Sequence, residues 1–175
     1  MLRRWATAPS PGWQGVEPGV TARGEALALL DAAGWTLDDE CNAAVYERCY
    51  AFRHDGVRAS EPDAVAFVYV AREQVAQIAL LRFGLSLGDL WLTFGAPDYV
   101  AIPPERIRAA SFDTALWFGS TGISTRIGFP CPADFRDMLR RPVSTILVWA
   151  RGTAMRETDA GTIAELRRAL REGCG

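Results

Sequence analysis

Few residues in this chain could carry out acid–base or nucleophilic chemistry. Among 175 residues there is one histidine, His54, and there are four cysteines, Cys41, Cys49, Cys131 and Cys174. Cys49 and His54 are close in sequence, but side chains along one extended strand diverge, whereas a nucleophile and its base must come within hydrogen-bond reach. We therefore interpret His54 as a surface residue of a turn that lies next to a cysteine of a sheet.

The cysteines allow two arrangements, which depend on the compartment. An even count permits two disulfides with three possible pairings in an oxidising compartment, and free thiols in a reducing one. Cys41 and Cys49 are close enough to be bridged if the chain between them folds back, whereas we interpret Cys131 and Cys174 as buried or incidental. No CxxC pair occurs, so the sequence favours neither a zinc ribbon nor a thioredoxin-like redox site.

Carboxylates form two further groups that could hold a ligand. The run Asp-Asp-Glu at 38–40 has the charge for a hard cation but lacks the loop spacing of a calcium site. We interpret it as a solvated or capping segment. Asp89, Asp98 and Asp113 lie in the second half of the chain, where they could line a small-molecule pocket together with aromatic rings.

The sequence contains no GxSxG, GxGxxG or HExxH motif and no phosphate-binding glycine loop. The stretch Gly-Ser-Thr-Gly at 119–122 is too short to cradle a phosphate and predicts a hairpin turn. The sequence therefore identifies no catalytic residue, no metal ligand and no cofactor, it leaves the binding residues open, and it favours a protein without enzymatic activity.

Six tryptophans are the most distinctive candidates for binding, at positions 5, 13, 35, 91, 117 and 149. Trp91, Trp117 and Trp149 fall on predicted helices or strands, where packing in the core is the default. Rings on an exposed sheet face would instead be interface anchors beside Arg126 or Arg48. The sequence does not say which face is exposed.

Composition excludes several classes of partner. The net charge is −2, with 49% hydrophobic and 23% charged residues, which fits one folded domain and provides no basic footprint for nucleic acid. No stretch is long enough for a membrane-spanning helix, and the apolar run at 142–150 has the length of a strand. The start at 1–8 is basic but lacks the apolar segment of a signal peptide, so the compartment stays open.

Local patterns predict two similar series of elements. Prolines and glycines make 1–18 an irregular lead-in, after which Thr21 caps a helix that ends at Gly34, and strands follow at 44–53, 64–70 and 74–82. Ser86 and Asp89 have the spacing of a capping box for a second helix. Strands are then expected at 112–118, 123–129 and 143–149, with a short helix at 133–140.

The tail predicts a last helix, with Thr162 and Glu165 in capping-box spacing and an apolar side that includes Leu166. We expect this helix to pack on the body with a solvated basic face, and a partner-docking helix is the alternative.

The offset of 65 residues from Thr21 to Ser86 indicates an internal repeat. It predicts an α+β fold in which two helix-plus-three-strand units stand in tandem and form one antiparallel sheet, with helices packed on one face and a helix at the C-terminus. The expected parts are a lead-in at 1–18, units at 19–82 and 83–150, and a helix and tail at 151–175, all within one compact domain.

The helix starts also carry a resemblance to a known superfamily. Gly-Val-Thr at 19–21, and Gly-Leu-Ser-x-x-Asp at 84–89 leading to Phe-Gly-Ala-Pro-Asp at 94–98, are similar to the opening of a module shared by the small outer-membrane lipoproteins of the β-barrel assembly machinery and the β-lactamase inhibitor proteins. The resemblance implies a tandem α+β fold, protein binding rather than catalysis, and a location outside the cytoplasm. This chain departs from the pattern in having Asp-Ala-Ala-Gly at 31–34 and no lipobox cysteine near Met1.

Together these observations predict a non-enzymatic protein-interaction module of the bacterial cell envelope. The expected partner is another protein, with no nucleic acid and no integral membrane segment. The alternative is a small-molecule-binding domain or enzyme with a pocket between sheet and helices, and a third possibility is a subunit whose apolar surface is an oligomer contact.

Overall fold

The computed structural model describes residues 12–41, 45–54, 64–101, 111–119, 121–130, 134–150 and 160–172. The elements of the first half are α2 (Arg23–Ala32), β1 (Thr36–Cys41), β2 (Arg48–His54), β3 (Ala64–Ala71) and β4 (Gln74–Leu81). Those of the second half are α3 (Leu87–Phe94), β5 (Tyr99–Ala101), β6 (Ser111–Phe118), β7 (Ile123–Pro130), α4 (Phe135–Arg140), β8 (Thr145–Trp149), β9 (Ala160–Gly161) and α5 (Ile163–Glu172).

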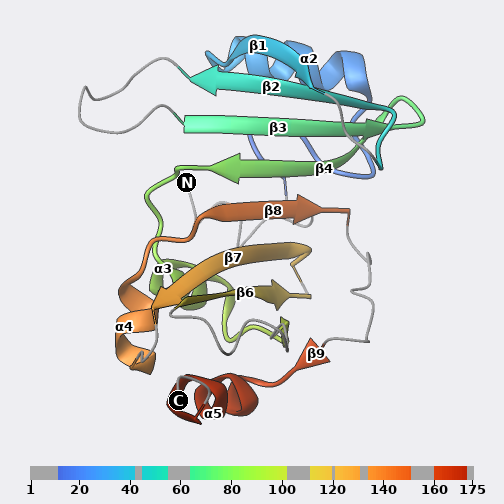
Figure 1. The fold of residues 1–175 in the computed structure, drawn as a ribbon. Coiled ribbons are helices and arrows are strands. Elements are labelled where there is room, and N and C mark those ends of the chain that lie inside the picture. The colour runs from blue at the N-terminus through green and yellow to red at the C-terminus, as the bar shows by residue number, and fades with distance from the viewer. Residues whose placement is uncertain are drawn as a thin grey trace.

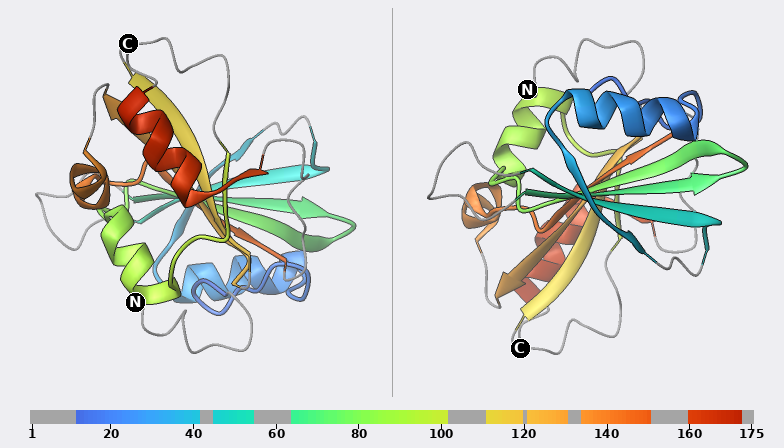
Figure 2. Two further views of the ribbon diagram at one scale, coloured as in Figure 1. Left: turned by 90° about the horizontal axis from the view of Figure 1, so that it is seen from below. Right: turned by 90° about the horizontal axis from the view of Figure 1, so that it is seen from above.

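The strands form one antiparallel sheet in the order β1-β2-β3-β4-β8-β7-β6-β5-β9 (Figure 1). This confirms the predicted α+β class with an antiparallel sheet. The strands of each half are hydrogen-bonded mainly to their neighbours in sequence, and β4 and β8 join the halves through pairs that run from Gln77↔Trp149 to Leu81↔Thr145. Figure 2 shows the strands fanned out, as expected for a twisted sheet.

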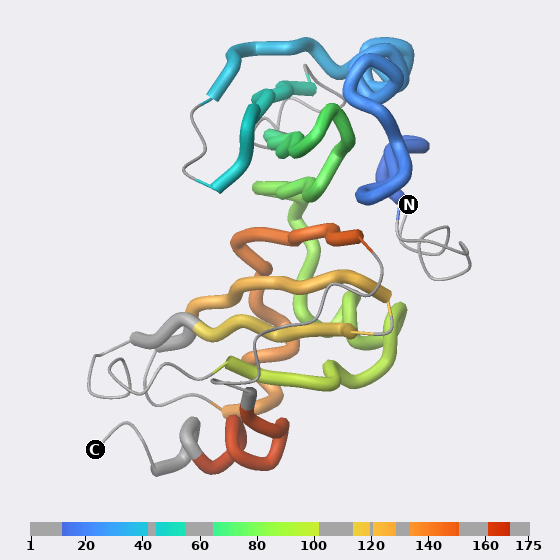
Figure 3. The backbone as a smooth tube through the Cα atoms, turned by 90° about the vertical axis from the view of Figure 1, so that its right-hand side faces the viewer, coloured from blue at the N-terminus to red at the C-terminus, as the bar shows by residue number. Residues whose placement is uncertain are grey.

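One face of the sheet contributes to the same core as α2 and α3, and the burial of β3 alternates accordingly. Ala66, Val68 and Val70 of β3 are at most 1% exposed, while the residues between them are partly exposed. Helix α2 contributes Ala26 and Leu30 to the same core. Figure 3 shows α2 and α3 on the same side of the sheet.

In the second half, aromatic contacts connect three helices. The ring of Trp91 on α3 meets Phe135 of α4 edge-on at 5.7 Å between centroids. The Arg167 guanidinium of α5 lies 4.2 Å from the centre of that Phe135 ring, a cation–π arrangement. Leu166 of α5 is fully buried, so the last helix packs on the body, as expected.

Residues 12–18 of the lead-in contribute to the core, which their composition did not reveal, while 1–11 lie outside the described residues. Trp13 and Val16 have no exposed surface and are hydrogen-bonded to each other through their backbones. The ring of Trp13 meets Trp35 edge-on at 4.6 Å between centroids. The side chains of this turn therefore close the end of the core beside α2.

The predicted cap of the first helix is wrong. The N-cap of α2 is Ala22, which has no side-chain cap, and Thr21 is a buried residue whose Oγ1 accepts from the Glu17 backbone N–H at 2.8 Å. The hydroxyl closes the preceding turn and is therefore not directed at the helix. The two N-caps, Ala22 and Ser86, are 64 residues apart rather than 65.

The strand count is also different from the prediction. β1 precedes the three strands expected in the first half, and β5 and β9 add to the second. β1 contains the acidic run and is exposed at all but its last residue, so it lacks the alternation that marks a half-buried strand. β5 has three residues and β9 has two, which is too short for a periodic signal.

Both predicted capping boxes are confirmed. In α3 the Ser86 Oγ accepts from the Asp89 backbone N–H at 3.2 Å, and the Asp89 carboxylate accepts from the Ser86 backbone N–H at 2.8 Å. Thr162 and Glu165 form the same reciprocal pair at the start of α5. Each box satisfies backbone donors that a helix start leaves unpaired.

We predict that Ser86→Ala lowers the free energy of unfolding by about 1 kcal/mol, because the α3 start loses its side-chain acceptor. Urea unfolding of the two proteins at pH 7 measures this difference.

Hydrogen bonds from the Ser86 hydroxyl and backbone N–H hold the pKa of Asp89 below its ordinary value. The stability from this carboxylate is therefore present above the unfolded pKa of about 4 and is lost as the pH falls through the folded pKa. In urea unfolding, the cost of Asp89→Asn should shrink as the pH is lowered.

The matched control is Glu25→Gln, since Glu25 is also an exposed acid in the first turn of a helix but α2 has no side-chain cap. It should change the stability by a few tenths of a kcal/mol. Equal costs for Asp89→Asn and Glu25→Gln at pH 7 would contradict the role of the capping box.

Candidate functional site

The face of the sheet opposite α2 and α3 has an aromatic surface. Directly paired residues project to the same side of a sheet, so the strand registers define this face. We call the following residues the open face: Phe67 and Tyr69 of β3, Gln77 and Ala79 of β4, Leu147 and Trp149 of β8, Ser124 and Arg126 of β7, and Trp117 of β6. Within the residues that the structure describes, no helix lies on it (Figure 1).

The rings of the open face form two groups, one in each half. Tyr69 lies 5.0 Å from Tyr46 and 6.5 Å from Phe67 between ring centroids. Across the central pair of strands, Trp117 lies 5.6 Å from Trp149. Phe67, Tyr69 and Trp149 keep part of their surface in contact with solvent, so both groups present apolar area outward.

The orientation of Trp149 is fixed by a hydrogen bond. Its indole Nε1–H donates to the Ser124 Oγ on β7 at 3.0 Å. Ser124 is 4% exposed, and a buried hydroxyl with this partner stabilises one rotamer of the ring. The ring is therefore held in place without a ligand.

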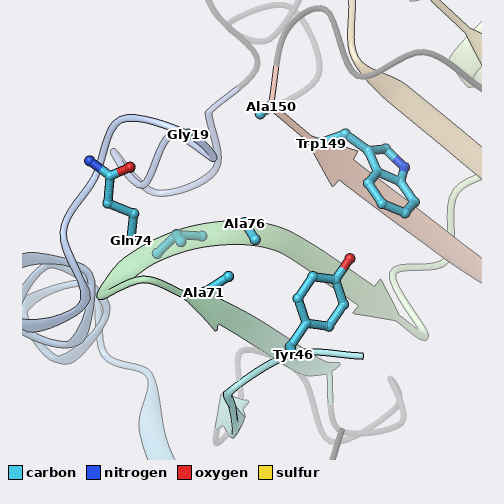
Figure 4. Close-up of a pocket in the computed structure, with 8 residues that line it drawn as sticks. Gly19, Tyr46, Ala71, Gln74, Ala76, Trp149 and Ala150 are labelled. Carbon is cyan, nitrogen blue, oxygen red and sulfur yellow. The ribbon is translucent and has the colours of Figure 1, made fainter. Parts of the chain in front are cut away.

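A hollow of 320 Å³ opens between the two aromatic groups. Tyr46 and Trp149 line it together with Gln74 and with smaller residues of β4 and of the segments beside it, namely Gly19, Ala71, Val75, Ala76 and Ala150. Figure 4 shows the Tyr46 ring and the Trp149 indole beside Ala76. The small residues between the two large rings leave this space open.

Tyr46 is held over the sheet by two contacts. Its hydroxyl donates to Gln77 Oε1 at 2.9 Å, and its ring packs on Tyr69. Gln77 is only 6% exposed and is paired with Trp149, so the hydrogen bond brings the tyrosine to the border between the two halves. Burial raises the pKa of Tyr46, and the neighbouring Tyr69 raises it further.

The segment that carries Tyr46 is closed by a disulfide. Cys41 at the end of β1 and Cys49 in β2 are directly opposite each other, with 4.8 Å between their Cα atoms, within the range for a bridged pair. The sequence left this pairing open, and the structure joins the two residues. Cys131 and Cys174 lie outside the described residues.

The residues that could have formed a cysteine–histidine pair have other roles. Cys49 is in the disulfide and is not a free nucleophile. His54 is the last residue of β2 rather than a turn residue, and its ring meets Trp35 edge-on at 5.0 Å between centroids. The turn expected after it, at 55–56, lies outside the described residues.

The carboxylates of the second half do not converge on a pocket in the described structure. Asp89 closes the capping box, and Asp98 Oδ2 accepts from the Gly119 backbone N–H at 2.6 Å, which braces the hairpin between β6 and β7. Asp113 is in β6, but its side chain is not among those described. Asp38 of the acidic run forms an ion pair with Arg53 at 2.7 Å. Among the described residues, no group of three or more His, Cys, Asp or Glu could hold a metal ion.

The tryptophans differ in burial. Trp13 and Trp35 are buried in the core, Trp117 is on the open face but only 8% exposed, and Trp149 on the same face is partly exposed. Trp5 lies outside the described residues. Arg126 is exposed on the open face. Arg48 is not beside these rings, because it pairs with Val70 and therefore projects to the helix side.

Sequence reasoning missed Tyr46 as a site residue. It falls at 44–53, which the apolar pattern assigned to a strand, but the strand begins at Arg48. The one available signal was the pair of cysteines on either side of it, since a bridge between them forces the intervening chain into a loop.

Comparison with protein-family models, with curated proteins and with solved structures finds no match to this chain. Among the described helices, none has the length and apolar character needed to cross a membrane. The geometry of the open face therefore carries the functional argument.

We predict that two of the four tyrosines, Tyr46 and Tyr69, ionise above the ordinary tyrosine pKa of about 10, because burial raises the pKa of both. Since folding raises these values, their contribution to stability is complete below about pH 10 and is lost as the pH rises through the folded pKa. In an absorbance titration of the tyrosinates, Tyr46→Phe should remove a step that lies above the ordinary pKa. Removal of a step at the ordinary pKa instead would contradict the position of Tyr46.

Proposed function

We propose that this chain is a non-enzymatic protein-interaction module that binds another protein through the open face of its sheet. The observation that carries the proposal is a sheet face on which Phe67 and Tyr69 of β3 and Trp149 of β8 are partly exposed, with Arg126 of β7 exposed on the same face. Aromatic residues and arginine are enriched among the residues that dominate binding energy at protein interfaces.

The hollow favours a protein partner over a small molecule. Pockets for small molecules bury most of the ligand, whereas this hollow opens onto the sheet surface and is bordered by Tyr46 and Trp149. The alternative needs a pocket between sheet and helices, where the described side chains, including Leu80, Leu90 and Ile146, fill the core. An open hollow between the rings of Tyr46 and Trp149 suits a protruding apolar side chain of a folded partner.

We further propose that the two halves are tandem copies of one helix-and-strands unit. The N-cap residue of α2 and that of α3 each form an isolated antiparallel bridge near the central strand of their half. Ala22 pairs with Gln74, the first residue of β4, and Ser86 pairs with Pro142, shortly before β8. The flanking hydrogen bonds are equivalent, since Val75 N–H donates to the Thr21 carbonyl and Val143 N–H to the Leu85 carbonyl.

The sheet order supports the same proposal. The strands of each half are arranged outward from its central strand, β4 or β8, and these two pair antiparallel at the centre. Two similar units related by a local two-fold axis between β4 and β8 would produce this order. The arrangement agrees with the resemblance to the β-lactamase inhibitor proteins and barrel-assembly lipoproteins, and so with protein binding.

The disulfide supports a location outside the cytoplasm. Cross-strand disulfides persist in oxidising compartments such as the bacterial periplasm, and Cys41 and Cys49 are joined. We therefore assign the module to the cell envelope in this proposal.

Site-specific photocross-linking in the native host tests the proposed surface. A photoreactive phenylalanine analogue at Tyr69, on the open face, should give one adduct of defined mass. The same analogue at Leu92, which is 90% exposed on α3, should not. Once the partner is isolated, Trp149→Ala should weaken its binding at least about tenfold, as expected for a hot-spot tryptophan.

Adducts of equal yield and mass from both positions would contradict the proposal, as would an unchanged dissociation constant for a folded Trp149→Ala variant. Circular dichroism of each variant establishes that the sheet is intact.

A further inference from the structure

A disulfide bond joins the two ends of the segment that contains Tyr46, the residue that forms one wall of the hollow. Tyr46 lies in the segment between Cys41 and Cys49, and this disulfide joins the end of β1 to β2. Above the bridge, the tyrosine hydroxyl reaches Gln77, and Glu47 Oε2 accepts from the Arg72 backbone N–H at 2.7 Å in the turn between β3 and β4. Tyr46 and Glu47 are therefore both hydrogen-bonded to the first half of the sheet, just before the disulfide-bonded Cys49.

Apart from the disulfide, the end of β1 is held by its backbone pairs with β2 on one side only. This strand is at the edge of the sheet, with five of its six residues exposed, and a bulge interrupts its register between Leu37 and Asp39. Its ion pair, Asp38 with Arg53, is half exposed on both sides, and such pairs contribute little. Adjacent carboxylates at 38–40 repel one another, which further weakens an edge strand.

We propose that the Cys41–Cys49 disulfide is a redox switch for the hollow: the bridged form holds Tyr46 in place as its wall, and reduction releases Tyr46 and so removes this wall and weakens binding. The proposal rests on the function assigned to the open face and adds its regulation. It requires a dithiol reductant, which a thiol–disulfide exchange protein or a small dithiol can supply.

The exposure of the two sulfurs gives the direction of attack. Cys49 is 3% exposed, while Cys41 is partly exposed on the edge strand. A thiolate of the reductant attacks the Cys41 sulfur, a mixed disulfide forms, and Cys49 leaves as a thiolate that takes up a proton. The second thiol of the reductant, as its thiolate, then attacks the reductant sulfur that is bonded to Cys41. Cys41 leaves as a thiolate and is protonated. Two electrons pass to the protein, which gains two thiols, and the reductant becomes a cyclic disulfide.

The first test follows Tyr46 itself and needs no partner. In the oxidised protein, nuclear Overhauser contacts should connect the rings of Tyr46 and Tyr69, which are 5.0 Å apart. Reduction with dithiothreitol should abolish them, while contacts between Trp91 and Phe135 in the second half remain as a control for the fold. Persistence of the Tyr46–Tyr69 contacts after mass spectrometry has shown both thiols free would overturn the proposal.

The variant Tyr46→Ala, compared with the otherwise unaltered chain, keeps the test decisive if reduction loosens the first half. Tyr46→Ala in the oxidised protein removes the wall and leaves the disulfide intact. In the photocross-linking experiment at Tyr69, dithiothreitol should reduce the adduct of the otherwise unaltered chain about tenfold or more, the effect of losing one dominant side chain. Tyr46→Ala should show the same loss before reduction and no further loss after it.

The outcomes separate the switch from the function. An adduct that is formed equally with and without dithiothreitol overturns the switch and leaves the open face as a binding surface. A further large loss on reduction of Tyr46→Ala also overturns it, because the disulfide would then act through another part of the chain. Absence of any adduct in the oxidised protein contradicts the proposed function, whereas the Tyr46–Tyr69 contacts still report on the switch.

Discussion

The pairing of β4 with β8 is the interaction on which the rest of this structure depends. Each half of the chain contributes one of these two central strands, and without the pairing both strands would be open edges that recruit other chains. The five pairs from Gln77↔Trp149 to Leu81↔Thr145 convert two small sheets into one. They also set the register that brings the buried Gln77 beside Trp149, and so bring the Tyr46 hydroxyl to the border of the two halves.

A single sheet with helices on one side has two different faces, and the sequence distributes its residues accordingly. Ile78, Leu80 and Val148 project toward the helices and are at most 1% exposed, while their neighbours form the open face. The outer edge at β1 is acidic and bulged, features that discourage pairing with other chains. The open face has a different character, because Phe67, Tyr69 and Trp149 retain solvent contact, and it is the surface on which we place binding.

Features that depend on nearby residues were predictable from the sequence, and features that depend on distant pairing were not. The capping boxes at Ser86 and Thr162 follow from three-residue spacing, and the central strands follow from apolar runs. Thr21 shows the limit of this approach, since its hydroxyl suits a cap equally well but is taken by the Glu17 amide. No local pattern could place Tyr46 near Trp149, which is about a hundred residues away in sequence and becomes its neighbour only through the order of the strands and the disulfide-closed segment.

Residue-resolved amide hydrogen exchange along β4 tests the central claim most directly. In an antiparallel ladder, successive amides point to opposite neighbours, so a strand with partners on both sides protects every residue. The account predicts slow exchange at each position from Gln77 to Leu81, comparable with that of β3. Alternating slow and fast amides over these residues would identify β4 as an edge strand, and one continuous open face could not then exist.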